Sequence, residues 1–113
     1  MKITKGDIFI ANLDPTVASE IQKTRPVIVV SNDVSNAHSD LITVVPITSQ
    51  KLTKVYPFEV LLPDNTQGLE RPSKAKANQI RTLDKQRFSK KVGRIDPDTI
   101  LKLGRALKIH LDL

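Results

Sequence analysis

Apolar residues gather in short runs along the first half of the chain, and polar segments separate these runs. Residues 8–13 form the first run and predict a strand, which the turn at residues 14–16 ends. Residues 26–31 are a nearly continuous β-branched run, which is typical of a strand buried on both faces. Residues 41–47 repeat this pattern and predict a third strand. The polar connection at residues 32–39 has room for one helical turn.

The patterns in the second half are weaker. Residues 56–62 alternate only in part and lie among prolines, which favours a strand near an edge of a sheet. Residues 64–68 are rich in turn formers. We expect a short strand at residues 73–77 with its lysines facing solvent. A last short strand is expected within residues 89–95.

The C-terminal segment predicts a helix. Asp96 can cap it, and Pro97 suits the first helical position. We expect the helix to span Pro97–Leu111, with one apolar face made by Ile100, Leu103, Leu107 and Leu111. Leu101 and Ile109 point elsewhere. They are either ordinary exposed residues or part of a second contact surface, such as a dimer interface.

This succession predicts a mainly β fold, a small and strongly bent antiparallel sheet or barrel with the C-terminal helix packed outside. The length of 113 residues fits one domain over residues 1–113. There is no cysteine, and the two histidines lie far apart, so no metal site is expected. The chain has no transmembrane-length apolar run and no signal-like N-terminus, so we expect a cytoplasmic protein without membrane contact.

The charge balance favours an acidic partner. The formal net charge is +6, from 18 Lys and Arg against 12 Asp and Glu. One tyrosine, three phenylalanines and no tryptophan argue against a single-strand binder that works mainly by stacking bases. Several lysines, including Lys51, Lys74, Lys76 and Lys90, are interpreted as solvated charges, some of which steer an anionic partner.

Arg25 lies where a polar loop meets an apolar strand. Pro26 biases the residue before it towards extended geometry, so Arg25 is expected at the mouth of the strand. A fixed cation at such a junction is a common way to build a site. The alternative is that Arg25 is one more solvated charge.

An ordered set of short segments resembles the MazF/PemK (Kid) family of toxin–antitoxin endoribonucleases over nearly the whole chain. The segments are GDI (6–8), DPT (14–16), SE (19–20), RPV (25–27), ND (32–33), PIT (46–48), PFEV (57–60), QIRTLDK (79–85) and the terminal helix. The resemblance implies an SH3-like barrel that forms a homodimer. It implies sequence-specific cleavage of single-stranded RNA, usually mRNA, without metal or cofactor. It also implies inhibition by a cognate antitoxin with an acidic C-terminal segment.

The resemblance also implies roles for individual residues. Arg25 and Thr48 match the residues tied to cleavage, and Ser19, Glu20 and Gln79 match positions that contribute to the site or to RNA contacts. With this match, Gln79 becomes a candidate for hydrogen bonding to a base edge.

Two further cations and three loop positions complete the expected site. Lys23 and Arg81 are candidates for RNA contacts. Family members often carry glycine in the loop where this chain has Ala18, Gln22 and Lys23. The loss of glycine should stiffen the loop and affects sequence preference more than chemistry.

Metal-free RNA cleavage requires the 2′-OH to attack the adjacent phosphorus. Arg25 suits the stabilisation of the phosphorane oxygens, and the Thr48 hydroxyl can donate to the same phosphate. Arginine stays protonated, so Glu20 is the better proton acceptor if it is buried or within reach of the 2′-OH. His38 is expected to be an exposed loop residue, and His110 to be favoured by the helix dipole.

Two other functions stay open at this stage. The first is a gyrase-poisoning toxin on the same barrel, which would act by binding another protein. The second is a catalytically silent RNA-binding module. The joint presence of Ser19, Glu20, Arg25, Thr48 and Gln79 counts against the gyrase poison. The silent module would bind RNA without producing cyclic-phosphate ends.

Overall fold

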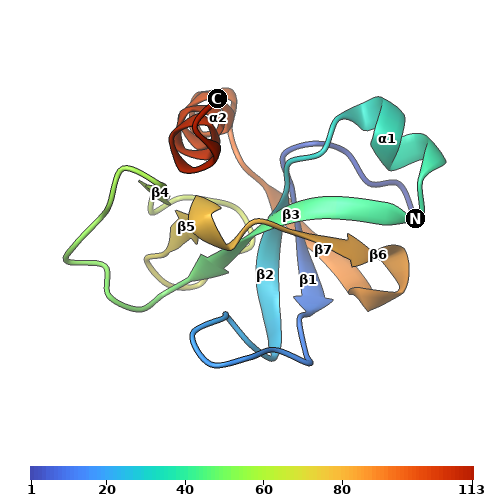
Figure 1. Cartoon of the computed structure of the whole chain (residues 1–113), viewed down its shortest axis with the longest axis horizontal. Coiled ribbons are helices and arrows are strands. Elements are labelled where there is room, and N and C mark those ends of the chain that lie inside the picture. The colour runs from blue at the N-terminus through green and yellow to red at the C-terminus, as the bar shows by residue number, and fades with distance from the viewer.

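A bent antiparallel sheet of seven strands is the centre of the fold in the computed structural model, which describes residues 1–113 (Figure 1). The strands are β1 (Asp7–Asn12), β2 (Thr24–Val29), β3 (Leu41–Thr48), β4 (Glu59–Leu61), β5 (Lys74–Lys76), β6 (Arg81–Asp84) and β7 (Phe88–Arg94). The helices are α1 (Asp33–His38) and α2 (Pro97–Leu111), with short 3₁₀ turns η1 (Ala77–Gln79) and η2 (Lys85–Arg87). The predicted mainly β fold with an outer helix is confirmed.

The long strand β3 organises the sheet. The strand order is β4-β5-β3-β2-β1-β7, and β6 pairs with the first half of β3. Strands β4 and β7 are the two ends of this order and do not pair with each other. The strongly bent sheet therefore does not close. The predicted burial of the second apolar run on both faces is confirmed, because Ile28 packs in the core beneath α2 while Val27 and Val29 pack in the core on the other face.

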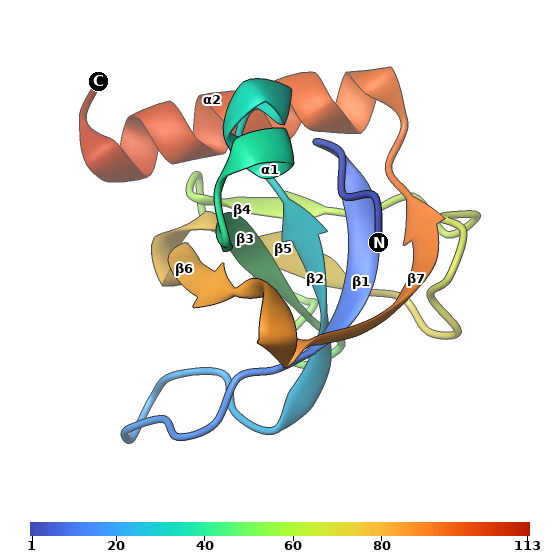
Figure 2. The same ribbon diagram turned by 90° about the vertical axis from the view of Figure 1, so that its right-hand side faces the viewer.

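Helix α2 has the bounds that its sequence predicts. The Asp96 carboxylate accepts a hydrogen bond from the Thr99 amide at 2.7 Å, and Pro97 takes the first helical position. Leu103 and Ala106 are buried against the sheet, and Figure 2 shows the helix lying across one end of it. Of the predicted apolar face, Leu111 is exposed. Neither helix is long and apolar enough to cross a membrane.

Asp7 joins the first strand to the last. Its carboxylate is buried, lies 2.7 Å from Arg94 Nη1 and 3.1 Å from Lys91 Nζ, and accepts two hydrogen bonds from Thr4. Burial alone raises the pKa of Asp7. The hydrogen bonds from Thr4, Lys91 and Arg94 outweigh burial and hold this pKa below its usual range.

The Asp7 cluster predicts a loss of stability in acid. A lowered folded-state pKa contributes stability that is complete above the unfolded value of about 3.9 and is lost as pH falls through the folded pKa. Urea unfolding between pH 7 and pH 3 should therefore show a decline below about pH 4. Asp7→Asn should be less stable at pH 7 and should flatten this decline. Asp64→Asn, at an exposed carboxylate, serves as the control. An Asp7→Asn profile parallel to that of the unmodified protein would contradict the assignment.

Candidate active site

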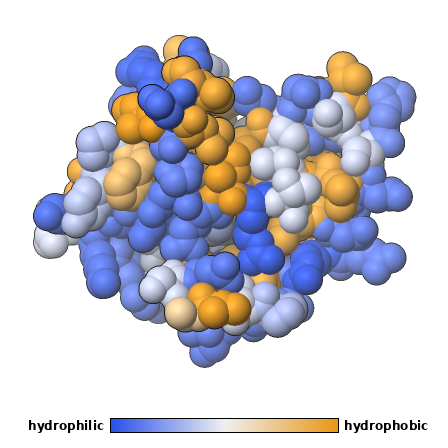
Figure 3. Space-filling view, viewed as in Figure 1, coloured by the Kyte–Doolittle hydropathy of each residue, from blue (hydrophilic) through white to orange (hydrophobic).

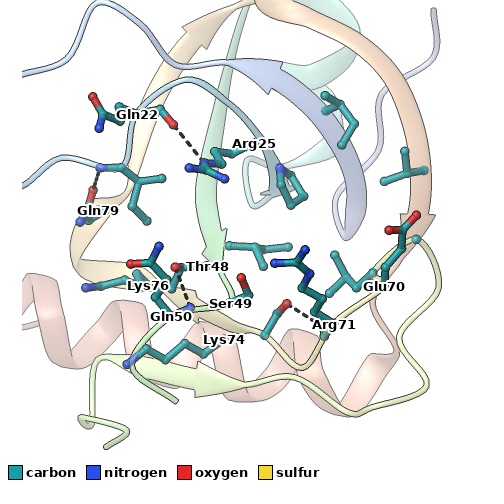
Figure 4. Close-up of a pocket in the computed structure, with 18 of the residues that line it drawn as sticks. Gln22, Arg25, Thr48, Ser49, Gln50, Glu70, Arg71, Lys74, Lys76 and Gln79 are labelled. Carbon is teal, nitrogen blue, oxygen red and sulfur yellow. Dashed lines mark hydrogen bonds between the residues drawn. The ribbon is translucent and has the colours of Figure 1, made fainter. Parts of the chain in front are cut away.

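A wide groove lies between the β1–β2 loop (residues 13–23), the end of β3 and the β4–β5 loop (residues 62–73) (Figure 4). Its volume is about 720 Å³. Five of the side chains expected at the site line it: Ser19, Glu20, Arg25, Thr48 and Gln79. The fold therefore brings together residues that are far apart along the chain.

Arg25 is held in place by its own loop. Strand β2 begins at Thr24 rather than at Pro26, so Arg25 lies inside the strand and pairs with Ala11 of β1. Its Nε donates to the Gln22 carbonyl at 3.1 Å, and its terminal nitrogens make no hydrogen bond or ion pair. A guanidinium fixed in this way keeps two parallel donors free, which is the arrangement that grips phosphate oxygens.

Thr48 is the last residue of β3 and pairs with Lys74 of β5. Its Oγ1 accepts a hydrogen bond from the Gln50 amide at 3.2 Å. A threonine hydroxyl can accept and donate at once, so its proton stays available to a phosphate oxygen.

Gln79 fastens the β1–β2 loop to the end of η1. Its Oε1 accepts from the Ile21 amide at 2.7 Å, and its Nε2 donates to the Ser19 carbonyl at 3.2 Å. A side-chain amide has two donor hydrogens and two acceptor lone pairs, so half of this capacity is unused. Contact with a base edge stays a prediction, and the structure adds the role of positioning the loop.

Two of the loop positions that lack glycine have a left-handed backbone. Ala18 has φ of 49° and Lys23 has φ of 67°, whereas Gln22 is not among the positive-φ residues. The left-handed region costs a residue with a Cβ roughly 1–2 kcal/mol. The Lys23 amide donates to Asp14 Oδ1 at 3.0 Å, and its carbonyl accepts from Leu13 at 2.9 Å. These bonds hold Lys23 in its left-handed conformation, and the stiffness of the loop stays a prediction.

Lys23 and Arg81, the two remaining predicted RNA contacts, do not line the groove. Arg81 Nη1 donates to the Leu13 carbonyl at 3.0 Å, and Arg87 of η2 donates to the Asn12 carbonyl at 3.2 Å. Both arginines bind backbone at the start of the β1–β2 loop. The structure thus gives Arg81 a part in supporting the loop, and its contact with RNA stays a prediction.

Glu20 lies on the exposed surface of the groove. Its Oε1 accepts from the Val17 amide at 2.7 Å, and its other oxygen makes no hydrogen bond. Glu20 was expected to act as proton acceptor if it is buried or lies within reach of the 2′-OH. It is not buried, so its role depends on reach to the 2′-OH. Neither His38 nor His110 lines the groove.

Lys74 contradicts the prediction that the lysines of β5 face solvent. Its side chain is 3% exposed, and its Nζ lies 2.9 Å from Glu59 Oε1. The same ammonium donates to the carbonyls of Lys51 at 2.8 Å and Lys54 at 3.0 Å. Three acceptors around one ammonium satisfy its donors, which is the condition under which a lysine is tolerated in a core.

The partner of Lys74 is equally buried. Burial alone raises the pKa of Glu59, but the Lys74 ammonium, the Tyr56 amide and nearby Lys76 outweigh it and hold this pKa below its usual range. Lys74 also ties the β3–β4 loop (residues 49–58) to the sheet, because it donates to the carbonyls of Lys51 and Lys54 in that loop. This loop supplies Lys51 and its neighbours to the groove.

The groove is strongly positive. Six cationic side chains and two carboxylates line it: Arg25, Lys51, Arg71, Lys74, Lys76 and Lys90, with Glu20 and Glu70. Of the six cations, Lys74 and Lys76 are paired with Glu59, and the other four make no ion pair. Arg71 and Lys90 were not among the residues predicted at the site from the sequence. The arrangement suits a chain of anions. The protein has no cluster of three or more His, Cys, Asp or Glu side chains able to hold a metal ion.

The chain matches a known protein family over nearly its whole length. Residues 4–111 match the family model described as PemK-like, MazF-like toxin of type II toxin-antitoxin system. The chain is 45% identical to Endoribonuclease MazF9 of Mycobacterium tuberculosis, over 96% of each chain. It is 38% identical to Endoribonuclease EndoA of Bacillus subtilis, over 100% of this chain and 97% of that one.

Solved structures show the same fold. The crystal structure of MazF from Deinococcus radiodurans superposes with a TM-score of 0.86 at 26% identity, over 100% of this chain and 99% of that chain. The family model, the two sequence relatives and this fold all point to one assignment. The chain belongs to the PemK/MazF family of type II toxin–antitoxin toxins.

Proposed function

We propose that this protein is an endoribonuclease toxin that cleaves single-stranded RNA. One observation carries the proposal: the free guanidinium edge of Arg25 and the Thr48 hydroxyl line one positively charged groove. The names of the two sequence relatives, both endoribonucleases, support it.

The chemistry follows from these groups. Arg25 binds the non-bridging oxygens of the scissile phosphate and stabilises the charge that develops on them. Thr48 donates to the same phosphate. Glu20 takes the proton of the 2′-OH as this oxygen bonds to phosphorus, and the bond to the 5′-oxygen breaks as that oxygen takes up a proton from water. The expected products are a 2′,3′-cyclic phosphate and a 5′-hydroxyl, formed without a metal.

The family also suggests partners. A positive groove suits the acidic C-terminal segment expected of a cognate antitoxin, which would inhibit cleavage by occupying it. A homodimer is supported by exposed apolar residues of α2 and the C-terminus, namely Leu101, Ile109, Leu111 and Leu113. Figure 3 shows hydrophobic surface gathered near the C-terminal end of α2. We further propose that the protein acts in the cytoplasm, on mRNA.

The decisive test uses the pure protein and a pool of synthetic RNA in EDTA, with no gyrase present. Sequencing the 5′ ends of the fragments should reveal one short motif, and the upstream fragments should end in cyclic phosphate. Binding without new ends would instead identify a silent RNA-binding module. If RNA is neither bound nor cut, while gyrase is inhibited in a separate assay, the protein is a gyrase poison.

Glu20→Gln tests the assignment of the proton acceptor. Glutamine keeps the oxygen that accepts from Val17, so the loop should keep its conformation while the base is lost. We expect the single-turnover rate to fall by about a hundredfold and its pH profile to change, because the proton acceptor is lost. Asp64→Asn, an exposed carboxylate outside the groove, is the control. An unchanged rate and pH profile would remove Glu20 from this role.

A further inference from the structure

The β4–β5 loop forms one wall of the groove and packs closely against β7. A Cβ at Gly93 of β7 would overlap the Gln67 carbonyl, and a Cβ at Gly68 would lie 2.5 Å from the Val92 carbonyl. Leu69 packs against the core beneath α2. Two glycines thus permit a backbone approach that a larger residue would prevent, and this wall is a built part of the fold.

This packing brings two cations to the groove, Arg71 from the loop and Lys90 from β7. Figure 4 shows Arg71 extending into the groove on the side opposite Gln79. Both side chains are exposed, and neither makes a hydrogen bond or an ion pair. Lys91, next along β7, is by contrast paired with Asp7 at 3.1 Å. Of these two adjacent lysines of β7, the one without a partner is therefore the one that lines the groove.

We propose that Arg71 and Lys90 form a second phosphate subsite, which binds a backbone phosphate of the RNA other than the scissile one. The inference rests on the proposed function, since it assigns part of the same groove to the same substrate. The subsite determines how far along the strand the protein makes contact. The guanidinium of Arg71 grips the phosphate oxygens, and Lys90 adds a point charge beside it.

The repeating charge of RNA favours this ligand over an acidic peptide. Every nucleotide carries a phosphate, so a strand with one phosphate at Arg25 offers further phosphates at regular intervals along the groove. A peptide carries charge only where its sequence has Asp or Glu. Glu70 also lines this wall and opposes any anion, but the surrounding cations outnumber it.

The test measures RNA affinity against salt. The probe is a synthetic RNA that carries the motif found by 5′-end sequencing, with a 2′-deoxy nucleotide at the attacking position so that it is bound but not cut. Arg71→Ala and Lys90→Ala should each weaken binding about fivefold at low salt and lower the slope of log Kd against log salt by about 0.7. Glu70→Gln should tighten binding, because it removes a like charge.

Shortening the RNA locates the subsite. If the probe is trimmed stepwise from each end, the effect of Arg71→Ala should vanish once the nucleotide that reaches the subsite is removed. Lys2→Ala, at an exposed lysine near the N-terminus and outside the groove, should change neither affinity nor slope. Thermal unfolding checks that each variant folds. If Arg71→Ala does not fold, Lys90→Ala and Glu70→Gln still test the proposal.

The outcomes separate the two proposals. If the unmodified protein cuts no RNA, the proposed function fails. If it cuts RNA but the Arg71 and Lys90 variants keep the same affinity and slope, the second subsite is wrong while the function stands. If the Arg71 and Lys90 variants bind an acidic peptide more weakly but bind RNA as the unmodified protein does, this wall binds the peptide, and the proposal is overturned.

Discussion

Arg25→Ala should reduce RNA cleavage by about a thousandfold, because the variant loses the donors that stabilise charge on the scissile phosphate. The fold should be retained. Arg25 is exposed, and its side chain makes a single hydrogen bond, to the Gln22 carbonyl. Loss of such a surface contact changes stability by about 0.5 kcal/mol or less. Single-turnover cleavage of the motif RNA measures the effect, and circular dichroism checks the fold.

Two controls make the Arg25 result specific. Arg25→Lys keeps the charge but loses the two-donor edge, so it should recover only part of the rate. Lys2→Ala removes an exposed charge outside the groove and should leave the rate unchanged. Full cleavage by Arg25→Ala would refute the proposed role of this residue, and with it the mechanism.

Glu59→Gln should destabilise the protein by about 3 kcal/mol, because it leaves the buried Lys74 ammonium without its counter-charge. Glutamine keeps the oxygen that accepts from the Tyr56 amide, so the change isolates the charge. The β3–β4 loop should loosen as well, since Lys74 also holds the carbonyls of Lys51 and Lys54. Urea unfolding at pH 7 measures the stability, and amide exchange over residues 50–56 measures the loop.

A double variant separates the ion pair from simple packing. Glu59→Gln with Lys74→Met replaces the pair by uncharged groups and should be more stable than Glu59→Gln alone, since no unpaired buried charge remains. Lys76→Ala is the matched single control, because its contact with Glu59 is longer, at 3.5 Å, and more exposed. If the double variant is as unstable as the sum of its single changes, the pair is not the cause.

Local patterns were enough to predict the elements that depend on neighbouring residues. The bounds of α2 followed from Asp96 and Pro97, because a cap and a fixed φ act within one turn. The bounds of β3 followed within one residue from a dense apolar run. The start of β2 was missed, because its polar residues Thr24 and Arg25 carry no apolar signal and their pairing with β1 sets the boundary.

Burial of charge could not be predicted in this way. Lysines on either side of Ala75 resemble an exposed strand, yet Lys74 is in the core. Its burial requires a carboxylate from β4 and two carbonyls from a loop, and these acceptors are 15 to 23 residues away in the sequence. A pattern read along one strand contains none of this information.

The same distinction applies to the groove. The sequence by itself determined the fold class, the family and the main candidates Arg25, Thr48 and Gln79, because these rest on residue types and their order. Only the tertiary structure decided that Gln79 clamps the loop, that Ala18 and Lys23 are held in left-handed geometry, and that Arg71 and Lys90 share the groove. The physical reason is that each of these features depends on contacts between segments that chain folding alone brings together.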